Sequence, residues 1–286
     1  MSAASAGVRL VEPEALLERA SELSAWCDLD PPTVRDLQCS LRRDHDQMCW
    51  VGPGGEGAMV VVRCWGSASV KFLAVPAAAR GRGIGAALLD ASQGWAADNG
   101  CQNVMFGLSA PGYLWPGVEL GLTTMETFLT GRGYREVMWA VNQIVELPVD
   151  LPRGRARAAR ADDVEQVAAF CQTHYAHWET EARWSFDEVS PKCAVWFEAG
   201  ELLGFACWSV TREGWFGPMA TRPDLREGRN RRGIGTGTLG VALAGLAADG
   251  YSSAEISWVG PERFYARTAG ARAHRAFRVF QRSVTG

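Results

Sequence analysis

The sequence contains an internal repeat, and a repeat of this length restricts the chain to an architecture of two similar halves. The segment Arg80-Gly-Arg-Gly-Ile-Gly85 recurs as Arg231-Arg-Gly-Ile-Gly235, so that two Gly-Ile-Gly triplets begin at positions 83 and 233. Each triplet opens a stretch of apolar residues with helical spacing, which ends at Gly100 in the first copy and at Gly250 in the second. We therefore expect two domains of one fold.

The residues around each triplet follow the same order in both halves. Two strands joined by a glycine-containing turn and a third strand precede the motif, over 47–75 and over 193–220, and another strand follows the motif helix. A break that contains proline and glycine lies at 148–154. The pattern predicts an α/β fold with a mixed sheet in each half, an N-terminal domain over 1–147 and a C-terminal domain over 155–286.

Composition limits the class of partner. Of the 286 residues 47% are apolar and 21% are charged, as in ordinary globular proteins, and the net charge of −3 gives no basic excess for nucleic acid or an anionic membrane. We find no long apolar run and no signal-peptide pattern at the start, so we expect a cytoplasmic protein. The eight cysteines lack C-x-x-C spacing, which favours reduced, buried thiols over a disulfide framework.

The glycine motif has the chemistry of a phosphate-binding loop. A strand that ends in Arg-x-x-Gly-x-Gly and continues into a helix brings backbone N–H groups and the positive helix terminus toward an anion. The motif alone could also be only a tight turn, and neither copy has the third glycine of a dinucleotide-binding fold or the Gly-Lys-Ser/Thr of a Walker loop. The candidate cofactor-binding residues are Val75, Arg80, Gly81, Arg82, Gly83, Ile84 and Gly85 in the first copy, and Ala220, Thr221, Arg226, Arg231, Arg232, Gly233, Ile234 and Gly235 in the second.

At these residues the sequence resembles a known family. Val75 followed by Arg80-Gly-Arg-Gly-Ile-Gly85, an amphipathic helix and a strand is similar to motif A of the GCN5-related N-acetyltransferases, and the later segments 128–134 and 264–270 also fit. The resemblance covers both halves and implies two tandem acyl-CoA N-acyltransferase-like domains. It further implies acetyl-CoA as cofactor, with its pyrophosphate on the loop and its pantetheine arm between two strands that separate.

The two copies depart from the family pattern in different places. The resemblance implies a tyrosine in the late helix that protonates the leaving CoA thiolate. Spacing puts Phe128 in that position in the first copy and Tyr265 in the second, where the alternative is a packed aromatic ring. We therefore expect the N-terminal domain to be degenerate and the C-terminal domain to be catalytic, with Tyr265 as its general acid.

The second loop is longer than the first by four residues. Its four arginines could surround the phosphates of CoA or could belong to a solvated surface loop; they are Arg226, Arg229, Arg231 and Arg232. An insertion over 109–124 in the first copy could cap the cleft or pack between the domains, and we favour packing between the domains. The general base is left open among Glu179, Glu181 and Glu198.

These expectations lead to three hypotheses about function. The leading hypothesis is transfer of an acetyl group from acetyl-CoA to the primary amine of a small molecule. The alternatives are a non-catalytic acyl-CoA-binding sensor or scaffold, and aminoacyl or peptidyl transfer, against which the acidic charge balance argues. We expect no metal, since His174 and His177 have no evident third ligand. The acceptor and the oligomeric state are not readable from the sequence.

Overall fold

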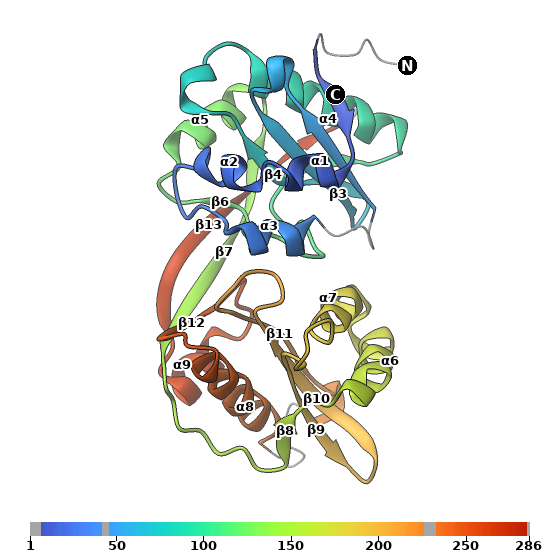
Figure 1. Cartoon of the computed structure of the whole chain (residues 1–286), viewed down its shortest axis with the longest axis vertical. Coiled ribbons are helices and arrows are strands. Elements are labelled where there is room, and N and C mark those ends of the chain that lie inside the picture. Colours follow the sequence, from blue (N-terminus) through green and yellow to red (C-terminus); the bar gives the residue numbers. More distant parts are fainter. Residues whose placement is uncertain (1–6, 42–45, 226–232, 285–286) are drawn as a thin grey trace. The chain divides into compact units, whose positions relative to one another are not determined.

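The chain forms two compact units in a computed structural model, which describes residues 7–41, 46–225 and 233–284 (Figure 1). The first unit consists of Met1–Ala140 together with Ala276–Gly286, and the second consists of Val141–Arg275. Within each unit the strands pair in both antiparallel and parallel fashion, and helices cover both faces, as the repeat predicts.

The first unit begins with short helices and continues as a meander of strands that leads to the motif. Its helices are α1 (Pro13–Leu17), α2 (Ala20–Ala25), α3 (Val34–Ser40), α4 (Ile84–Asp98) and α5 (Thr123–Gly131). Its strands are β1 (Arg9–Val11), β2 (Gln47–Val51), β3 (Ala58–Cys64), β4 (Ser67–Ala74), β5 (Asn103–Phe106), β6 (Val118–Glu119) and the start of β7 (Arg135–Glu146).

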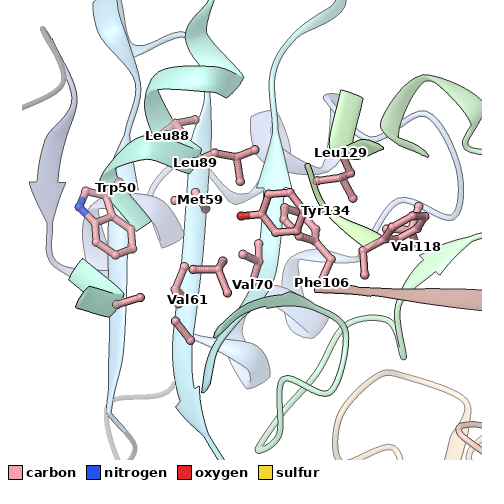
Figure 2. Close-up of a cluster of buried hydrophobic side chains, with 14 of the residues drawn as sticks. Trp50, Met59, Val61, Val70, Leu88, Leu89, Phe106, Val118, Leu129 and Tyr134 are labelled. Carbon is pink, nitrogen blue, oxygen red and sulfur yellow. The ribbon is translucent and has the colours of Figure 1, made fainter. Parts of the chain in front are cut away.

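Side chains of β3 alternate between the two faces of this sheet. Met59 and Val61 pack with Leu88 of α4 in one core, whereas Ala58 and Val60 pack under α1, α2 and α3 in another. Figure 2 shows the first of these cores, with Leu88 over the strands. Because both faces of β3 are covered, its sequence is an almost continuous apolar run.

The second unit repeats this plan. Its helices are α6 (Val164–His174), α7 (Glu179–Trp184), α8 (Ile234–Ala248) and α9 (Glu262–Ala269). Its strands are β8 (Ala156–Ala158), β9 (Cys193–Glu198), β10 (Glu201–Trp208), β11 (Trp215–Thr221), β12 (Ser253–Ile256) and the start of β13 (Arg272–Ser283). Side chains of β10 alternate in the same way, because Phe205 packs under α6 and α7 while Ala206 packs under α8.

Strand order is the same in both units. In the first, β1, β2, β3 and β4 are antiparallel neighbours and β4 pairs with β5 in parallel. In the second, β8, β9, β10 and β11 are antiparallel and β11 pairs with β12 in parallel. The predicted order of elements around each motif is therefore confirmed.

In each unit, the parallel strand after the motif helix pairs on its other side with a strand from the other half of the chain. In the first unit β5 pairs with the end of β13, where Phe280 lies opposite Phe106. In the second unit β12 pairs with the end of β7, where Glu146 lies opposite Ser253. The compact units therefore differ from the predicted domains 1–147 and 155–286: residues 141–147 belong to the second unit and residues 276–286 to the first. The strands β7 and β13 each contribute residues to both units, so no single linker position can divide the chain into these two units.

Two smaller expectations concern cysteines and membrane segments. All eight cysteines are free thiols, and all except the half-buried Cys27 are buried, as predicted. Within the described part of the chain, no helix has the length and apolar character needed to cross a bilayer.

Candidate functional site

A pocket of about 480 Å³ lies in the first unit at the end of β4. Its walls come from β4, the glycine loop, the start of α4, the end of β5, α5, and two segments far apart in sequence, Trp26–Leu29 and Trp115–Glu119. The lining is mostly apolar, with Asp28, Lys71 and Arg80 among its charged residues. Such a pocket suits a ligand with an apolar body and a few charged groups.

The pocket exists because β4 and β5 pair over only part of their length. Pairing begins at Ala68 with Val104 and ends at Val70 with Phe106, whereas β4 continues to Ala74. On the side that faced β5, the remaining backbone amide groups of β4 therefore face the pocket. The separation of these strands is what the family resemblance implies for the pantetheine arm.

The glycine loop presents an accessible helix terminus to this pocket. Gly83 is the N-cap of α4 with φ 84°, and Gly81 has φ 76°, a left-handed conformation that glycine adopts without strain. A Cβ added at either glycine would meet nothing within 4 Å. The backbone N–H groups at the start of this 15-residue helix are thus open to an anionic ligand, and the loop fits a pyrophosphate.

Other predicted residues of the first copy meet at the same place. Val75, Ile84 and Gly85 line the pocket. Gly85 lies under Phe128 of α5, because a Cβ at Gly85 would be 3.3 Å from Cζ of Phe128. Arg82 is not a lining residue and forms an ion pair with Glu56 at 2.7 Å.

Arg80 lines the pocket and is held by the segment after α2. Its Nη1 donates to Oδ2 of Asp28 at 2.8 Å and its Nη2 donates to Oδ1 at 3.1 Å. Nη2 also donates to the carbonyl of Trp26 at 3.2 Å, and Nε donates to the carbonyl of Val75 at 2.9 Å. The guanidinium therefore joins the end of β4 to the 26–28 segment.

The aromatic wall of the pocket was missed by sequence reasoning. Trp115, from the 109–124 insertion, stacks on Phe72 of β4 with ring centroids 6.4 Å apart, and its Nε1 donates to Asp30 at 2.9 Å. Lys71 is buried beside it and donates to the carbonyls of Ser40 and Pro111 at 3.0 and 2.6 Å. The insertion thus lines the cleft of its own unit, which is the less favoured of the two roles considered for it. Its Pro-Gly-Tyr-Leu-Trp-Pro-Gly composition is the signal that could have identified the wall.

The second glycine motif forms the same turn in different surroundings. Gly233 is the N-cap of α8 with φ 73°, and Ile234 is buried against Trp196 and Leu203. Ala220 and Thr221 end β11, where the carbonyl of Thr221 accepts a hydrogen bond from the Tyr175 hydroxyl at 2.8 Å. The predicted arginines Arg226, Arg231 and Arg232 lie outside the described residues.

Tyr265 is buried in the second unit. Its hydroxyl donates to Sδ of Met219 at 3.8 Å, and its ring contacts Phe216 and Phe264 edge to face. Burial raises the pKa of Tyr265 above its ordinary value, so the hydroxyl keeps its proton at neutral pH. These surroundings fit the packed aromatic ring, while its role as general acid stays a prediction.

The packing of α5 and α9 assigns a different counterpart to Phe128 from the one that the sequence spacing predicts. A Cβ at Gly235 would be 3.4 Å from Cζ of Phe264, just as one at Gly85 would meet Phe128. Phe128 therefore corresponds to Phe264 rather than to Tyr265. The two helices differ in length and end in different caps, which is why counting back from the glycine after the helix gave another pairing.

Two of the three candidate general bases, Glu179 and Glu198, pair with arginines of the second unit. Glu179 accepts from Nε of Arg183 at 3.0 Å, and Glu198 forms an ion pair with Arg155 at 3.4 Å. Glu181 is buried at the start of α7. Across the described ranges of the chain, no three His, Cys, Asp or Glu side chains come together as metal ligands.

The part of the chain that matches a protein-family model lies within the first unit. Residues 15–111 match the Acetyltransferase (GNAT) family, a span that runs from α1 through β5 and includes the glycine motif. No curated protein matches the chain in sequence.

Solved structures match nearly the whole chain at low identity. A tandem GNAT protein from the clavulanic acid biosynthesis pathway has a TM-score of 0.65 and 15% identity, with 98% of each chain covered. A GCN5-related N-acetyltransferase from Sphaerobacter thermophilus has a TM-score of 0.63 and 19% identity, with 97% of this chain and 95% of that one covered. A fungal multi-domain GH3 β-N-acetylglucosaminidase with a GCN5-related glucosamine N-acetyltransferase region has a TM-score of 0.74 and 17% identity, with 96% of this chain covered and only 38% of the fungal chain spanned.

The fold, the strand separation and the glycine loop define a protein with two acyl-CoA N-acyltransferase-like units. Within the first unit residues 15–111 match the Acetyltransferase (GNAT) family, and the chain as a whole has the fold of the tandem GNAT protein.

Proposed function

We propose that the chain is an acyl-CoA-dependent N-acetyltransferase whose acetyl-CoA site is the pocket of the first unit. The observation that carries the proposal is that one pocket joins the glycine loop, the unpaired end of β4 and an aromatic wall. The open N–H groups at Gly83 suit the pyrophosphate. The end of β4 suits the pantetheine arm, and the wall with Trp26 and Trp115 suits a small acceptor with a primary amine.

Bound acetyl-CoA supplies an activated thioester, whose carbonyl carbon accepts the amine and whose C–S bond then breaks. Amide groups at the unpaired end of β4 stabilise the negative charge that develops on the carbonyl oxygen. Phe128 lines the pocket and has no proton to give. In this unit we assign the protonation of the thiolate to solvent, which also accepts the proton lost by the amine.

The second unit offers a second candidate for catalysis. The Tyr265 hydroxyl contacts Met219, which belongs to the stretch of β11 beyond Phe216, where pairing with β12 has ended. A general acid at this place could protonate a thiolate bound there. The prediction that the C-terminal half is catalytic comes from the position of Tyr265 in the sequence, and this contact with Met219 supports it.

The test is CoA thiol release from acetyl-CoA with a panel of small primary amines. We expect release with at least one amine, and we expect Gly83→Asp to reduce it strongly. CoA binding without release for any amine would favour the sensor or scaffold. Release that survives Gly83→Asp and is lost in Tyr265→Phe would move the chemistry to the second unit.

A further inference from the structure

We propose that Asp28 competes with the anionic phosphates of CoA for Arg80, so that binding of the cofactor releases Asp28 toward the acceptor. This inference rests on the proposed function, because it assigns a regulation to the same pocket. It concerns an ion pair that the glycine motif does not predict, since Asp28 and Arg80 are 52 residues apart in sequence.

The pair has the geometry of a strong and reversible contact. Both oxygens of Asp28 face the two terminal nitrogens of Arg80, at 2.8 and 3.1 Å, which is the bidentate arrangement that arginine also makes with phosphate. The two side chains remain 39% and 48% exposed. Water can therefore reach the pair, and exchanging one anion for another requires no buried charge to be left unpaired.

The two terminal nitrogens of Arg80 cannot form this bidentate contact with two anions at once. Nε is used by the carbonyl of Val75, and the two terminal nitrogens are used by Asp28 and by the carbonyl of Trp26. An anion that arrives at the open helix terminus of Gly83 meets a guanidinium whose charge is already balanced. An anion that takes the pair of terminal nitrogens bidentately displaces Asp28 and replaces its negative charge.

Displacement changes the acceptor side of the pocket. Asp28 and Trp26 belong to the segment between α2 and α3, and both line the pocket. A carboxylate that has lost its guanidinium favours a protonated primary amine as its next partner. The amine and CoA then strengthen each other's binding by the same factor, as linkage requires.

A second ion pair on the same loop provides a matched control. Arg82 and Glu56 are 2.7 Å apart, with exposed fractions of 59% and 40%. Arg82 does not line the pocket. Glu56→Gln therefore removes one negative charge close to the loop without changing the partner of Arg80.

The experiment measures CoA affinity by calorimetry at one ionic strength for the full chain and its variants. We expect Asp28→Asn to tighten CoA binding about two- to fivefold, the scale of one exposed ion pair. We expect Glu56→Gln to tighten it less, and Asp28→Asn to have no effect when Arg80→Gln is already present.

Three results would overturn the proposal. An unchanged affinity in Asp28→Asn, or an equal gain in Glu56→Gln, would show that Asp28 does not compete for Arg80. A gain from Asp28→Asn that persists with Arg80→Gln would assign the effect to general charge. Wild-type protein that binds no CoA would instead overturn the proposed function itself, together with this inference.

Discussion

The two motif helices have the same length and start at equivalent residues, yet they are buried differently. In α4 the buried residues, Ile84 and Leu88 among them, form one face, whereas α8 is buried almost all round. Glycines cause the difference. A Cβ at Gly237 would lie 2.5 Å from the carbonyl oxygen of Arg153, and one at Gly240 would lie 3.0 Å from Cβ of Leu151. The segment predicted as a linker therefore packs on α8, which shows that one motif can serve two environments.

The units also differ above the second glycine of the motif. In the first unit Gly85 is covered by Phe128, and the pocket opens beside it. In the second unit Gly235 is covered by Phe264 and also by Met219, whose Cε would be 3.1 Å from an added Cβ. The glycine motif thus determines the turn and the helix start, while residues from other elements determine whether a ligand can reach them.

The largest effect is expected from separating the two halves. Residues 1–147 alone lack the end of β13, so β5 keeps only β4 as a partner strand and the buried Phe277 and Phe280 are lost. Each such aromatic contributes about 3–5 kcal/mol, against a total stability of roughly 5–15 kcal/mol for a domain. We expect this fragment to be unfolded by circular dichroism.

Mixing the fragment with residues 148–286 is the control for the strand exchange, since the two pieces together supply every strand. We expect the mixture to regain a cooperative thermal transition. A fragment 1–147 that folds alone and binds CoA would show that the exchanged strand is dispensable.

The sequence predicted the elements well because their signals are local. Gly83 and Gly233 both adopt the left-handed conformation that precedes a helix, and the apolar runs of β3 and β10 are strands. The exchange of β7 and β13 could not be predicted, because a strand that pairs with its own half has the same pattern as one that pairs with the other.

The site residues predicted from the sequence line only one part of the pocket. The glycine loop was found from its motif, whereas Trp26 and Asp28 come from a turn some 50 residues earlier that has no motif. Spacing also misassigned the partner of Phe128, because that depends on how α5 and α9 pack over Gly85 and Gly235. Contacts between distant segments carry no signal in a single sequence.

A charge at the motif glycine tests which unit holds the cofactor. Gly83→Asp adds a carboxylate where the pyrophosphate is expected, and we predict at least about a tenfold loss of CoA affinity by calorimetry. Gly83→Asn has the same backbone strain without the charge and should lose less. Gly233→Asp is expected to weaken CoA binding less than Gly83→Asp, and the reverse order would assign the cofactor to the second unit.

Removing the Tyr265 hydroxyl tests the second unit directly. With catalysis in the first unit, Tyr265→Phe keeps the ring contacts with Phe216 and should change thiol release by less than about threefold. A general acid would instead contribute roughly a hundredfold or more. Unchanged CoA affinity with a hundredfold slower release would contradict catalysis in the first unit.

The two units also differ in how their helices begin. In the first unit Asp36 accepts from the backbone N–H of Thr33 at 2.9 Å. In the second, buried Asp163 accepts from the N–H of Arg160 at 2.7 Å and also from both terminal nitrogens of Arg157, at 2.7 and 2.9 Å. The hydrogen bonds from Arg157 lower the pKa of Asp163 below its ordinary value.

A carboxylate whose pKa is lowered by folding stabilises the folded state above its unfolded pKa, and this contribution is lost as the pH falls through the folded pKa. We therefore expect Asp163→Asn to reduce the free energy of unfolding by about 1.5–3 kcal/mol at pH 7. The difference from wild type should shrink as the pH falls below about 4, the ordinary pKa of aspartate. Denaturant unfolding at several pH values measures it, with Arg157→Gln as the matched control. A difference that is the same at pH 7 and at pH 3 would mean that Asp163 acts through its shape and not through its charge.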